Sequence, residues 1–364
     1  MLSKLFTKKF LGIDIGTSSV KIAEIEKSGD SFSLSNYGYI DFKSVEGVSS
    51  PLSKKAITAL SSDEIVEVIQ AVLSEAKIKT RECAFSIADF LTFFTAFSLP
   101  QMTEKELSEA VMFEARQHIP LPMDSVTVDW QKVGQQNGES KKVEITVEAI
   151  PNEIIAQYKE IAQKANLQII LMEAEAFGLA QVLIGKDEER PVCLVDIGFQ
   201  STVCSLVHKN ILRYSHSFDR GQNYLMREFF KSLPIDRQTA RRFEEKYGLE
   251  FIAFAEPEIK DNVGNILRDS MSPILKEIEM AINDFGHCLG ADIGKIIISG
   301  GVVAVPEVKG QFDSYFQKKV EIADPFKEIK YPPAIEAEIK SMAPMYAVAV
   351  GMARRAFEFK NRPK

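Results

Sequence analysis

The sequence has few residues that could cross-link the chain or hold a structural metal. Among 364 residues there are four cysteines and four histidines, with no C-x-x-C pair and no histidine at the spacing of a ligand partner. These absences argue against a disulfide framework and against a structural zinc site. With no signal-like N-terminus, the expected environment is reducing and cytoplasmic. Cys193 and Cys204 lie inside apolar runs, where a free cysteine usually packs as a small hydrophobic residue.

Long apolar runs and an excess of basic residues are also missing. The most apolar stretch is KIIISGGVVAVP, which is interrupted by paired glycines and is shorter than the roughly 20 residues that a transmembrane helix needs. A net charge of −7 gives no extended basic surface, so nucleic acid is not the expected partner. Both ends are locally basic, from Lys4 to Lys9 and from Arg354 to Lys364. Weak attraction to an anionic membrane surface and plain solvated termini both stay open.

Two common phosphate-binding motifs, G-x-G-x-x-G and the Walker A loop, are absent as well. The chain has a repeat instead. Residues 11–25 read LGIDIGTSSVKIAEI and residues 193–207 read CLVDIGFQSTVCSLV; each has an apolar strand, Asp-Ile-Gly, a hydroxyl-bearing tip and a second apolar strand. A single copy would be an ordinary Asp-x-Gly hairpin turn. Because Asp14 and Asp196 are half a chain length apart, the repeat predicts two domains of the same fold.

Two such hairpin tips can grip a polyphosphate from both sides. Backbone N–H groups and hydroxyls at the tips would bind phosphate oxygens, while Asp14 and Asp196 would hold Mg²⁺ through its retained waters. Gly12 and Lys21 lie in the strands that flank the first tip. The candidate nucleotide-binding residues of the two hairpins are Gly12, Gly16, Thr17, Ser18, Ser19, Lys21, Gly198, Gln200, Ser201 and Thr202.

A third element fits the same chemistry. In KIIISGGVVAVPEVKGQF, a β-branched strand at 296–298 runs into Ser299, Gly300 and Gly301, and a helix is expected after Pro306. The glycines allow the backbone to lie flat against a ligand. A Ser-Gly-Gly turn alone is a weak signal, but in one chain with two Asp-Ile-Gly hairpins it predicts a third contact with the nucleotide.

The order of these three elements resembles the superfamily of actin, the sugar kinases and the heat-shock chaperone ATPases. The resemblance implies an α/β fold of two actin-like (ribonuclease H-like) domains around a nucleotide cleft, with a small inserted α+β subdomain in the first. It also implies ATP and Mg²⁺ as cofactors. The two hairpins would be the phosphate loops, and the Ser-Gly-Gly turn would lie behind the adenosine.

The same resemblance suggests residues for catalysis and for ribose binding. Glu175, within LMEAEAFGLAQVL, takes the position that orients the attacking water, next to the cation-binding Asp14 and Asp196. The other interpretation is that Glu173 and Glu175 complement the dipole at the start of their helix. In DRQTARRFEEKYG, Glu245 is the candidate for binding a ribose hydroxyl. Whether ATP is hydrolysed stays open.

A small α+β module lies between the two parts of the first domain. Thr103 and Glu106 form a capping box, which predicts a helix with Leu107, Val111 and Ala115 on its buried face and a proline shortly after its end. Two strands are expected at residues 125–133 and 142–150, around a polar turn at 135–140.

This module, SLPQMTEKELSEAVMFEARQHIPLPMDSVTVDW, closely resembles the inserted subdomain of the PilM family of type IV pilus assembly. The resemblance extends over nearly the whole chain and includes YSHSFDRGQNYL and the closing APMYAVAVGMARRAF. It implies five segments. These are residues 1–80 as the first part of actin-like domain 1, 81–150 as the inserted interaction subdomain, 151–190 as the rest of domain 1, 191–343 as actin-like domain 2, and 344–364 as a closing helix that returns to domain 1.

The family resemblance implies a cytoplasmic, ATP-binding adaptor that is peripheral on the cytoplasmic face of the inner membrane. Its partner would be the N-terminal tail of a PilN-like membrane protein, together with other pilus assembly components; self-association stays open. The tail would bind in a groove between the inserted subdomain and the first domain, burying a few apolar side chains and adding backbone hydrogen bonds as extended peptides do at sheet edges. An apolar run there either lines this groove or belongs to the core: Phe93, Phe94, Phe97 and Leu99.

Two other functions compete within the same superfamily. A small-molecule kinase would need a carboxylate base that reaches an acceptor hydroxyl, and the sequence offers none beyond Asp14 and Glu175. An FtsA-like, filament-forming division protein usually ends in a linker and an amphipathic membrane helix, whereas this sequence closes with FEFKNRPK. The adaptor is therefore the expected function, with these two as alternatives.

Overall fold

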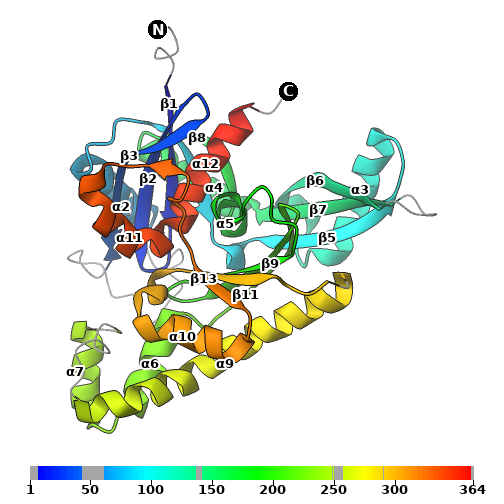
Figure 1. Cartoon of the computed structure of the whole chain (residues 1–364). Coiled ribbons are helices and arrows are strands. Elements are labelled where there is room, and N and C mark those ends of the chain that lie inside the picture. The colour runs from blue at the N-terminus through cyan, green and yellow to red at the C-terminus, as the bar shows by residue number, and fades with distance from the viewer. Residues whose placement is uncertain are drawn as a thin grey trace.

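The computed structural model describes residues 7–42, 61–136, 142–247, 249, 257–289 and 291–361. Within these ranges the strands form two large sheets and one small sheet (Figure 1). The first large sheet has six strands in the order β14-β3-β2-β1-β4-β8. Its strands are β1 (Lys8–Ile15), β2 (Ser19–Ser28), β3 (Ser31–Asp41), β4 (Glu82–Ile87), β8 (Gln168–Ala174) and β14 (Ile329–Lys330).

The second large sheet repeats this order. Its five strands are arranged β11-β10-β9-β12-β13, with an antiparallel three-stranded meander followed by two parallel strands, as in β3-β2-β1-β4-β8. The strands are β9 (Val192–Ile197), β10 (Thr202–His208), β11 (Ile211–Phe218), β12 (Lys295–Ser299) and β13 (Lys319–Ile322). Both predicted hairpins are present, as β1–β2 and β9–β10, so the duplication inferred from the sequence is confirmed.

Strand alternation sorts the side chains into layers. In β1, Leu11 and Ile13 pack in an outer apolar cluster with α2 (Ser62–Glu75) and α4 (Asn152–Lys164). Phe10 points to the other face and joins a middle cluster with α12 (Ala347–Asn361) and α5 (Glu175–Leu183), which also includes Leu194 and Ile297 from the second sheet. The helices α5 and α12 therefore lie between the two large sheets.

A third apolar cluster covers the far face of the second sheet. It contains Val195 and Ile298 from the strands, with helices below them in Figure 1. These helices are α6 (Gln222–Ser232), α9 (Pro257–Leu289) and α10 (Pro306–Phe316). The predicted helix after Pro306 is thus present, with the proline in its first turn. Two further α-helices lie among the described residues, α7 (Arg237–Tyr247) and α11 (Glu336–Met342).

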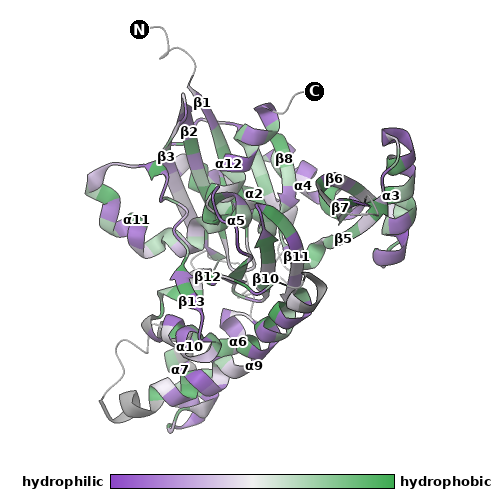
Figure 2. Ribbon diagram, turned by 45° about the vertical axis from the view of Figure 1, so that its right-hand side comes forward, coloured by the Kyte–Doolittle hydropathy of each residue, from purple (hydrophilic) through white to green (hydrophobic). Residues whose placement is uncertain are grey.

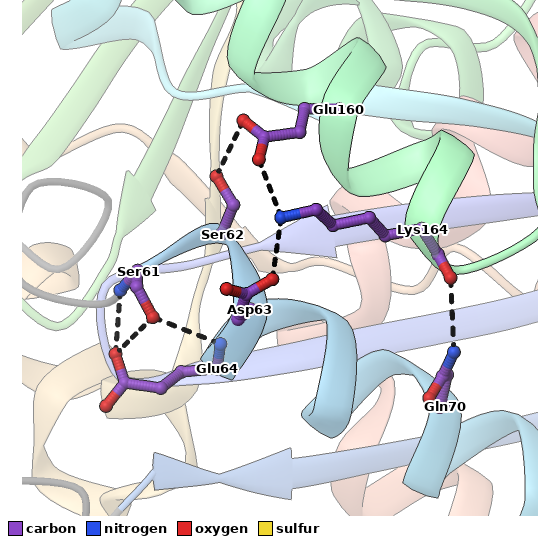
Figure 3. Close-up of polar contacts among 7 residues, drawn as sticks. All are labelled: Ser61, Ser62, Asp63, Glu64, Gln70, Glu160 and Lys164. Atoms are coloured by element: carbon purple, nitrogen blue, oxygen red, sulfur yellow. Dashed lines mark hydrogen bonds and ion pairs between the residues drawn. The ribbon is translucent and has the colours of Figure 1, made fainter.

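Polar contacts also connect α2 and α4 in the outer layer (Figure 3). At the start of α2, the Ser61 hydroxyl accepts the Glu64 N–H at 3.2 Å, and the Glu64 carboxylate accepts the Ser61 N–H at 2.7 Å. Lys164 of α4 lies 2.7 Å from carboxylate oxygens of both Asp63 and Glu160. These ion pairs are exposed and contribute little to stability. The apolar cluster beneath them is what holds the layer together.

The small sheet belongs to the inserted unit, which projects from the two large sheets (Figures 1 and 2). Its strand order is β5-β7-β6. Its elements are β5 (Phe93–Pro100), α3 (Glu104–His118), β6 (Val126–Gln136) and β7 (Lys142–Pro151). The Thr103–Glu106 capping box opens α3, and Leu107, Val111 and Ala115 are buried, as predicted. Part of the predicted polar turn lies outside the described residues.

The structure divides the chain differently from the expected segments at two places. Strand β4 falls in the expected inserted segment, 81–150, but pairs with β1 and β8 in the first large sheet. Its apolar sequence, ECAFSI, is typical of a central parallel strand. Strand β14 falls in the expected second domain, 191–343, but pairs with β3 of the first sheet. The inserted unit accordingly starts at β5.

Strand alternation in β5 also decides the placement of its apolar residues. Phe93, Phe97 and Leu99 pack against the core of the inserted unit. Phe94 points the other way, and its ring lies 6.2 Å, centroid to centroid, from that of Phe177 in α5. The structure therefore favours the core interpretation over a groove lining for this run.

Candidate functional site

The two hairpin aspartates lie at the carboxyl ends of equivalent strands. In β1, Asp14 shares a face with Phe10, which packs in the middle layer. In β9, Asp196 shares a face with Leu194, which packs in the same layer from the opposite side. Strand alternation on both sheets thus points the two carboxylates toward one region, where Glu175 begins α5.

A serine from the neighbouring parallel strand binds each aspartate. The Ser86 hydroxyl of β4 donates to Asp14 Oδ1 at 3.0 Å. The Ser299 hydroxyl of β12 donates to Asp196 Oδ1 at 2.6 Å. Both contacts follow from parallel registers that place β4 beside β1 and β12 beside β9. The sequence predicted Ser299 as a nucleotide contact and gave no prediction for Ser86. The signal that could have indicated Ser86 is its position at the end of an apolar parallel strand, which matches that of Ser299.

The two tips close in the same way. The Gly16 N–H donates to the Ser19 carbonyl at 2.9 Å, and the Gly198 N–H donates to the Ser201 carbonyl at 3.0 Å. Thr202, just beyond the second tip, donates its hydroxyl to the Arg220 carbonyl at 2.6 Å. The tips carry the predicted residues Thr17, Ser18 and Gln200, all partly exposed.

Two glycines let other backbone segments approach the second tip. A Cβ on Gly221, just before α6, would overlap the Gly198 carbonyl oxygen. Gly300 has a φ of 94°, and a Cβ there would overlap the Ile197 carbonyl oxygen. Gly301 follows in the same turn, where its nearest side-chain neighbour is Gln222 of α6. The Ser-Gly-Gly turn therefore lies directly behind the second hairpin.

Lys21 is the cation of the site. The antiparallel register places it opposite Asp14, and its Nζ lies 3.1 Å from Asp14 Oδ2. Burial by itself lowers the pKa of Lys21, but Asp14, Asp196 and Glu175 outweigh this and raise it. The amine thus stays protonated among carboxylates from both large sheets.

The carboxylates outnumber this cation. Burial raises the pKa of Glu175 well above its usual value, and the charges of Asp14, Asp89 and Asp196 raise it further. Burial likewise raises the pKa of Asp196, and Asp14 adds to the effect while the Ser299 hydrogen bond opposes it. Crowded carboxylate oxygens are the donors that Mg²⁺ prefers, so the donor set fits this cation. In the described part of the chain, no group of three or more histidine, cysteine, aspartate or glutamate side chains is placed to ligate one metal ion directly.

Asp89 is a member of this cluster that the sequence did not reveal. It begins the short helix η3 (Asp89–Leu91) between β4 and β5, and its side chain is 8% exposed. Burial and the charge of Asp196 raise its pKa to about 7, although the Ala176 N–H opposes this by hydrogen bonding. Its Oδ2 is buried and has no hydrogen-bond partner among the described residues.

The pKa of Asp89 predicts a pH dependence of stability. The folded chain binds this proton more tightly than the unfolded chain, since the pKa rises from 3.8 to about 7 on folding. The free energy of unfolding should therefore fall as the pH rises through this window, by at most about 1.4 kcal/mol per pH unit. We expect Asp89→Asn to gain stability relative to the wild type between pH 5 and pH 7.5 in urea unfolding. The exposed Asp313→Asn is the control, and parallel pH profiles for Asp89→Asn and the wild type would contradict the assignment.

Two other predicted site residues have different surroundings. Gly12 lies in β1 with its Cα facing α12, and a Cβ there would overlap the Ala349 carbonyl oxygen. The absence of a side chain at Gly12 thus allows α12 to pack closely against β1. Glu245 belongs to α7, and its side chain lies outside the described residues.

A pocket of about 700 Å³ lies away from the carboxylates. It is lined by the C-terminal end of α5, including Gln181 and Ile184, and by Lys295 and Ile297 of β12. Because β12 runs from Lys295 at this pocket to Ser299 at the aspartates, the two places lie toward opposite ends of one strand. Lys295 is already paired there with Glu188 at 3.1 Å.

Three basic residues near the C-terminus have partners within the protein. Arg355 is paired with Glu173, and Lys360 lies 3.0 Å from Glu82. The Arg354 guanidinium lies 4.1 Å from the centroid of the Phe32 ring. Through these contacts, the three basic residues of α12 help to pack this helix onto the first large sheet. A search of the described helices found none with the length and apolar character of a bilayer span.

Comparison with known proteins identifies the family. The family model described as type IV pilus assembly protein PilM matches residues 12–357. The chain belongs to the PilM family. This finding supports pilus assembly over the filament-forming and kinase alternatives.

Solved structures support the fold. The structure of this chain is similar to that of a PilM–PilN type IV pilus biogenesis complex, with a TM-score of 0.75, 20% identity, and coverage of 95% of this chain and 98% of that chain. The ethanolamine utilization protein EutJ of Carboxydothermus hydrogenoformans has a TM-score of 0.53 and 11% identity, and the match covers 96% of this chain and 90% of that chain. MreB5 of Spiroplasma citri bound to ADP has a TM-score of 0.51 and 12% identity, and the match covers 98% of this chain and 99% of that chain. The predicted fold of two actin-like domains is confirmed.

Proposed function

We propose that this member of the PilM family is a nucleotide-gated adaptor of type IV pilus assembly. It binds ATP with Mg²⁺ and captures the N-terminal tail of a PilN-like membrane protein. The observation that carries the proposal is the convergence of Asp14 and Asp196, one from each matched sheet, on Lys21 and Glu175. Membership of the PilM family supports the cellular role.

Each part of the site has a task toward Mg-ATP. The two closed tips present backbone N–H groups and hydroxyls to phosphate oxygens, and Asp14 and Asp196 hold Mg²⁺ through water. The bound cation offsets the charge of the phosphates and of the crowded carboxylates. Glu175 orients a water toward the γ-phosphate, a task for which position matters more than basicity. Gly300 and Gly301 back the adenosine, and Glu245 binds the ribose.

The adaptor works through binding. A solved relative is a PilM–PilN complex, which supports a PilN-like partner for this chain. Through that membrane partner the chain would lie on the cytoplasmic face of the inner membrane. The inserted unit is the surface for this partner. A nucleotide can gate capture only if it binds the capture-competent form more tightly than the other form, so hydrolysis is not required.

Gating predicts reciprocal coupling between the two ligands. A synthetic peptide of the N-terminal tail of the PilN encoded in the same genome is titrated by fluorescence anisotropy, with and without Mg-ATP. We expect the peptide affinity to change at least about fivefold, and the ATP affinity to change by the same factor when the peptide is present. No peptide binding, or equal peptide affinity with and without Mg-ATP, would contradict the proposal.

A further inference from the structure

Two carboxylates hold the start of α5, where Glu175 lies. The Ala174 N–H donates to Glu148 Oε1 at 2.7 Å, and the Ala176 N–H donates to Asp89. The N–H groups at the start of a helix have no partner within the helix, and the N-cap residue Ala174 has no side chain that could bind them. The backbone on either side of Glu175 is thus fixed by side chains from elsewhere in the chain.

Both carboxylates come from the ends of the inserted unit. Asp89 lies in η3, directly before β5. Glu148 lies in β7, opposite Phe94 of β5, and the Phe94 ring in turn packs on Phe177 of α5. The first turn of α5 is therefore attached to the segment that enters the inserted unit and to the strand that leaves it.

The same face of β7 also contacts the second large sheet. Ile145 and Val147 of β7 pack in the core of the inserted unit, so the alternate positions, Glu144 and Glu148, point out of it. Glu144 forms an ion pair with Arg213 of β11, and both side chains are largely buried. One strand of the inserted unit therefore touches α5 at Glu148 and the second sheet at Glu144.

The two carboxylates stabilise the start of α5 by accepting its N–H groups, but their burial costs free energy. Asp89 and Glu148 are 8% and 9% exposed, and Glu148 has a second carboxylate, Glu173, nearby. Burying a carboxyl group with one neutral N–H partner costs free energy that an apolar side chain of similar volume would not. Burial followed by the charge of Glu173 raises the pKa of Glu148 well above its usual value, so glutamine is a close mimic of its neutral form.

We propose that Asp89 and Glu148 are positioning residues that join the backbone around Glu175 to the inserted unit, so that nucleotide binding at the carboxylate site alters partner binding at that unit. This inference rests on the proposed function, and it assigns the coupling between nucleotide binding and partner binding to these two residues. Asp89 holds Ala176 with one oxygen and leaves the other near Asp196, while Glu148 holds Ala174 from the inserted sheet.

The test measures the ratio of tail-peptide affinities with and without Mg-ATP in four variants. In Glu148→Ala and Asp89→Ala we expect this ratio to fall to within about twofold of unity, while each ligand alone binds Glu148→Ala within about fivefold of the wild-type affinity. Glu148→Gln and Asp89→Asn keep an acceptor for the N–H groups and should keep the ratio. Glu148→Met, which keeps the volume of the side chain, replaces Glu148→Ala if that variant does not fold.

A matched control separates coupling from general loosening of the inserted unit. Glu106→Ala removes another helix-capping carboxylate of that unit, at the start of α3, where it accepts the Thr103 N–H; its ratio should match the wild type. Hydrogen exchange at the start of α5 gives a second readout: Mg-ATP should slow it in the wild type and not in Glu148→Ala.

The outcomes distinguish this inference from the proposed function. A wild type that binds no Mg-ATP or no peptide overturns the proposed function. A wild type that couples the two ligands, with Glu148→Ala and Asp89→Ala coupling them equally well, overturns the inference alone. Loss of coupling in Glu106→Ala to the same extent as in Glu148→Ala also overturns it.

Discussion

Replacement of both Asp14 and Asp196 with alanine is expected to lower the affinity for Mg-ATP at least about 100-fold, because each contact with a charged group contributes about 1.5–3 kcal/mol and two are lost. Both carboxylates are held in place by a serine, so the site is built before any ligand binds. The ATP dependence of tail-peptide capture should disappear in the same variant.

Isothermal titration calorimetry of the double variant with Mg-ATP measures this loss. The matched control is Asp292→Ala with Asp313→Ala, which removes two exposed aspartates that pair with lysines at the surface. Circular dichroism checks the fold of the double variant, because the loss of Asp14 and Asp196 relieves the crowding around Glu175 but removes the ion-pair partner of Lys21. Unchanged Mg-ATP affinity in the folded double variant would rule out the proposed site.

Gly12→Ala is expected to lower the free energy of unfolding by about 3 kcal/mol or more, with loss of the folded state as the extreme outcome. A Cβ at this position would overlap backbone atoms of Ala349 and approach those of Ala353, which cannot move unless α12 moves. Gly351→Ala should behave alike, because its Cβ would overlap the backbone of Gly178 in α5. Gly12 allows α12 to pack closely on β1, and Gly351 allows α12 to pack closely on α5.

Urea unfolding of the two variants tests this, with Gly310→Ala as the control. Gly310 lies in α10, where a Cβ would meet nothing within 4 Å, so alanine should be neutral or stabilising by up to about 1 kcal/mol. If Gly12→Ala is as stable as the wild type and weakens only Mg-ATP binding, Gly12 belongs to the nucleotide site, as the sequence suggested, and the packing explanation is wrong.

Features that depend on neighbours in the sequence were predictable. An Asp-Ile-Gly tip between two apolar strands specifies its own hairpin, and two copies specify the duplicated sheets. The Thr103–Glu106 box likewise specified the start of α3. In each case the residues that determine the structure lie within a few positions of one another, so the pattern is visible in one stretch of sequence.

Features that depend on pairing between distant strands were not predictable. Ser86 reaches Asp14 only because β4 pairs with β1 in one register, and Glu148 reaches Ala174 only because β7 lies beside the end of β8. Asp89 lay in the segment expected to be the inserted subdomain, 81–150, and nothing local distinguished its carboxylate from a surface one. The start of the inserted unit was misplaced for the same reason, since ECAFSI could pair with either sheet.

The central claim is that Asp14 and Asp196 share one Mg-triphosphate. A crystal structure of the protein with Mg²⁺ and a non-hydrolysable ATP analogue tests it most directly. We predict one nucleotide per chain, with its triphosphate between the Gly16 and Gly198 tips and one Mg²⁺ whose waters contact both carboxylates. A nucleotide bound at the pocket beside Gln181 and Lys295, or one that contacts a single tip with its Mg²⁺ remote from Asp14 or Asp196, would contradict the account.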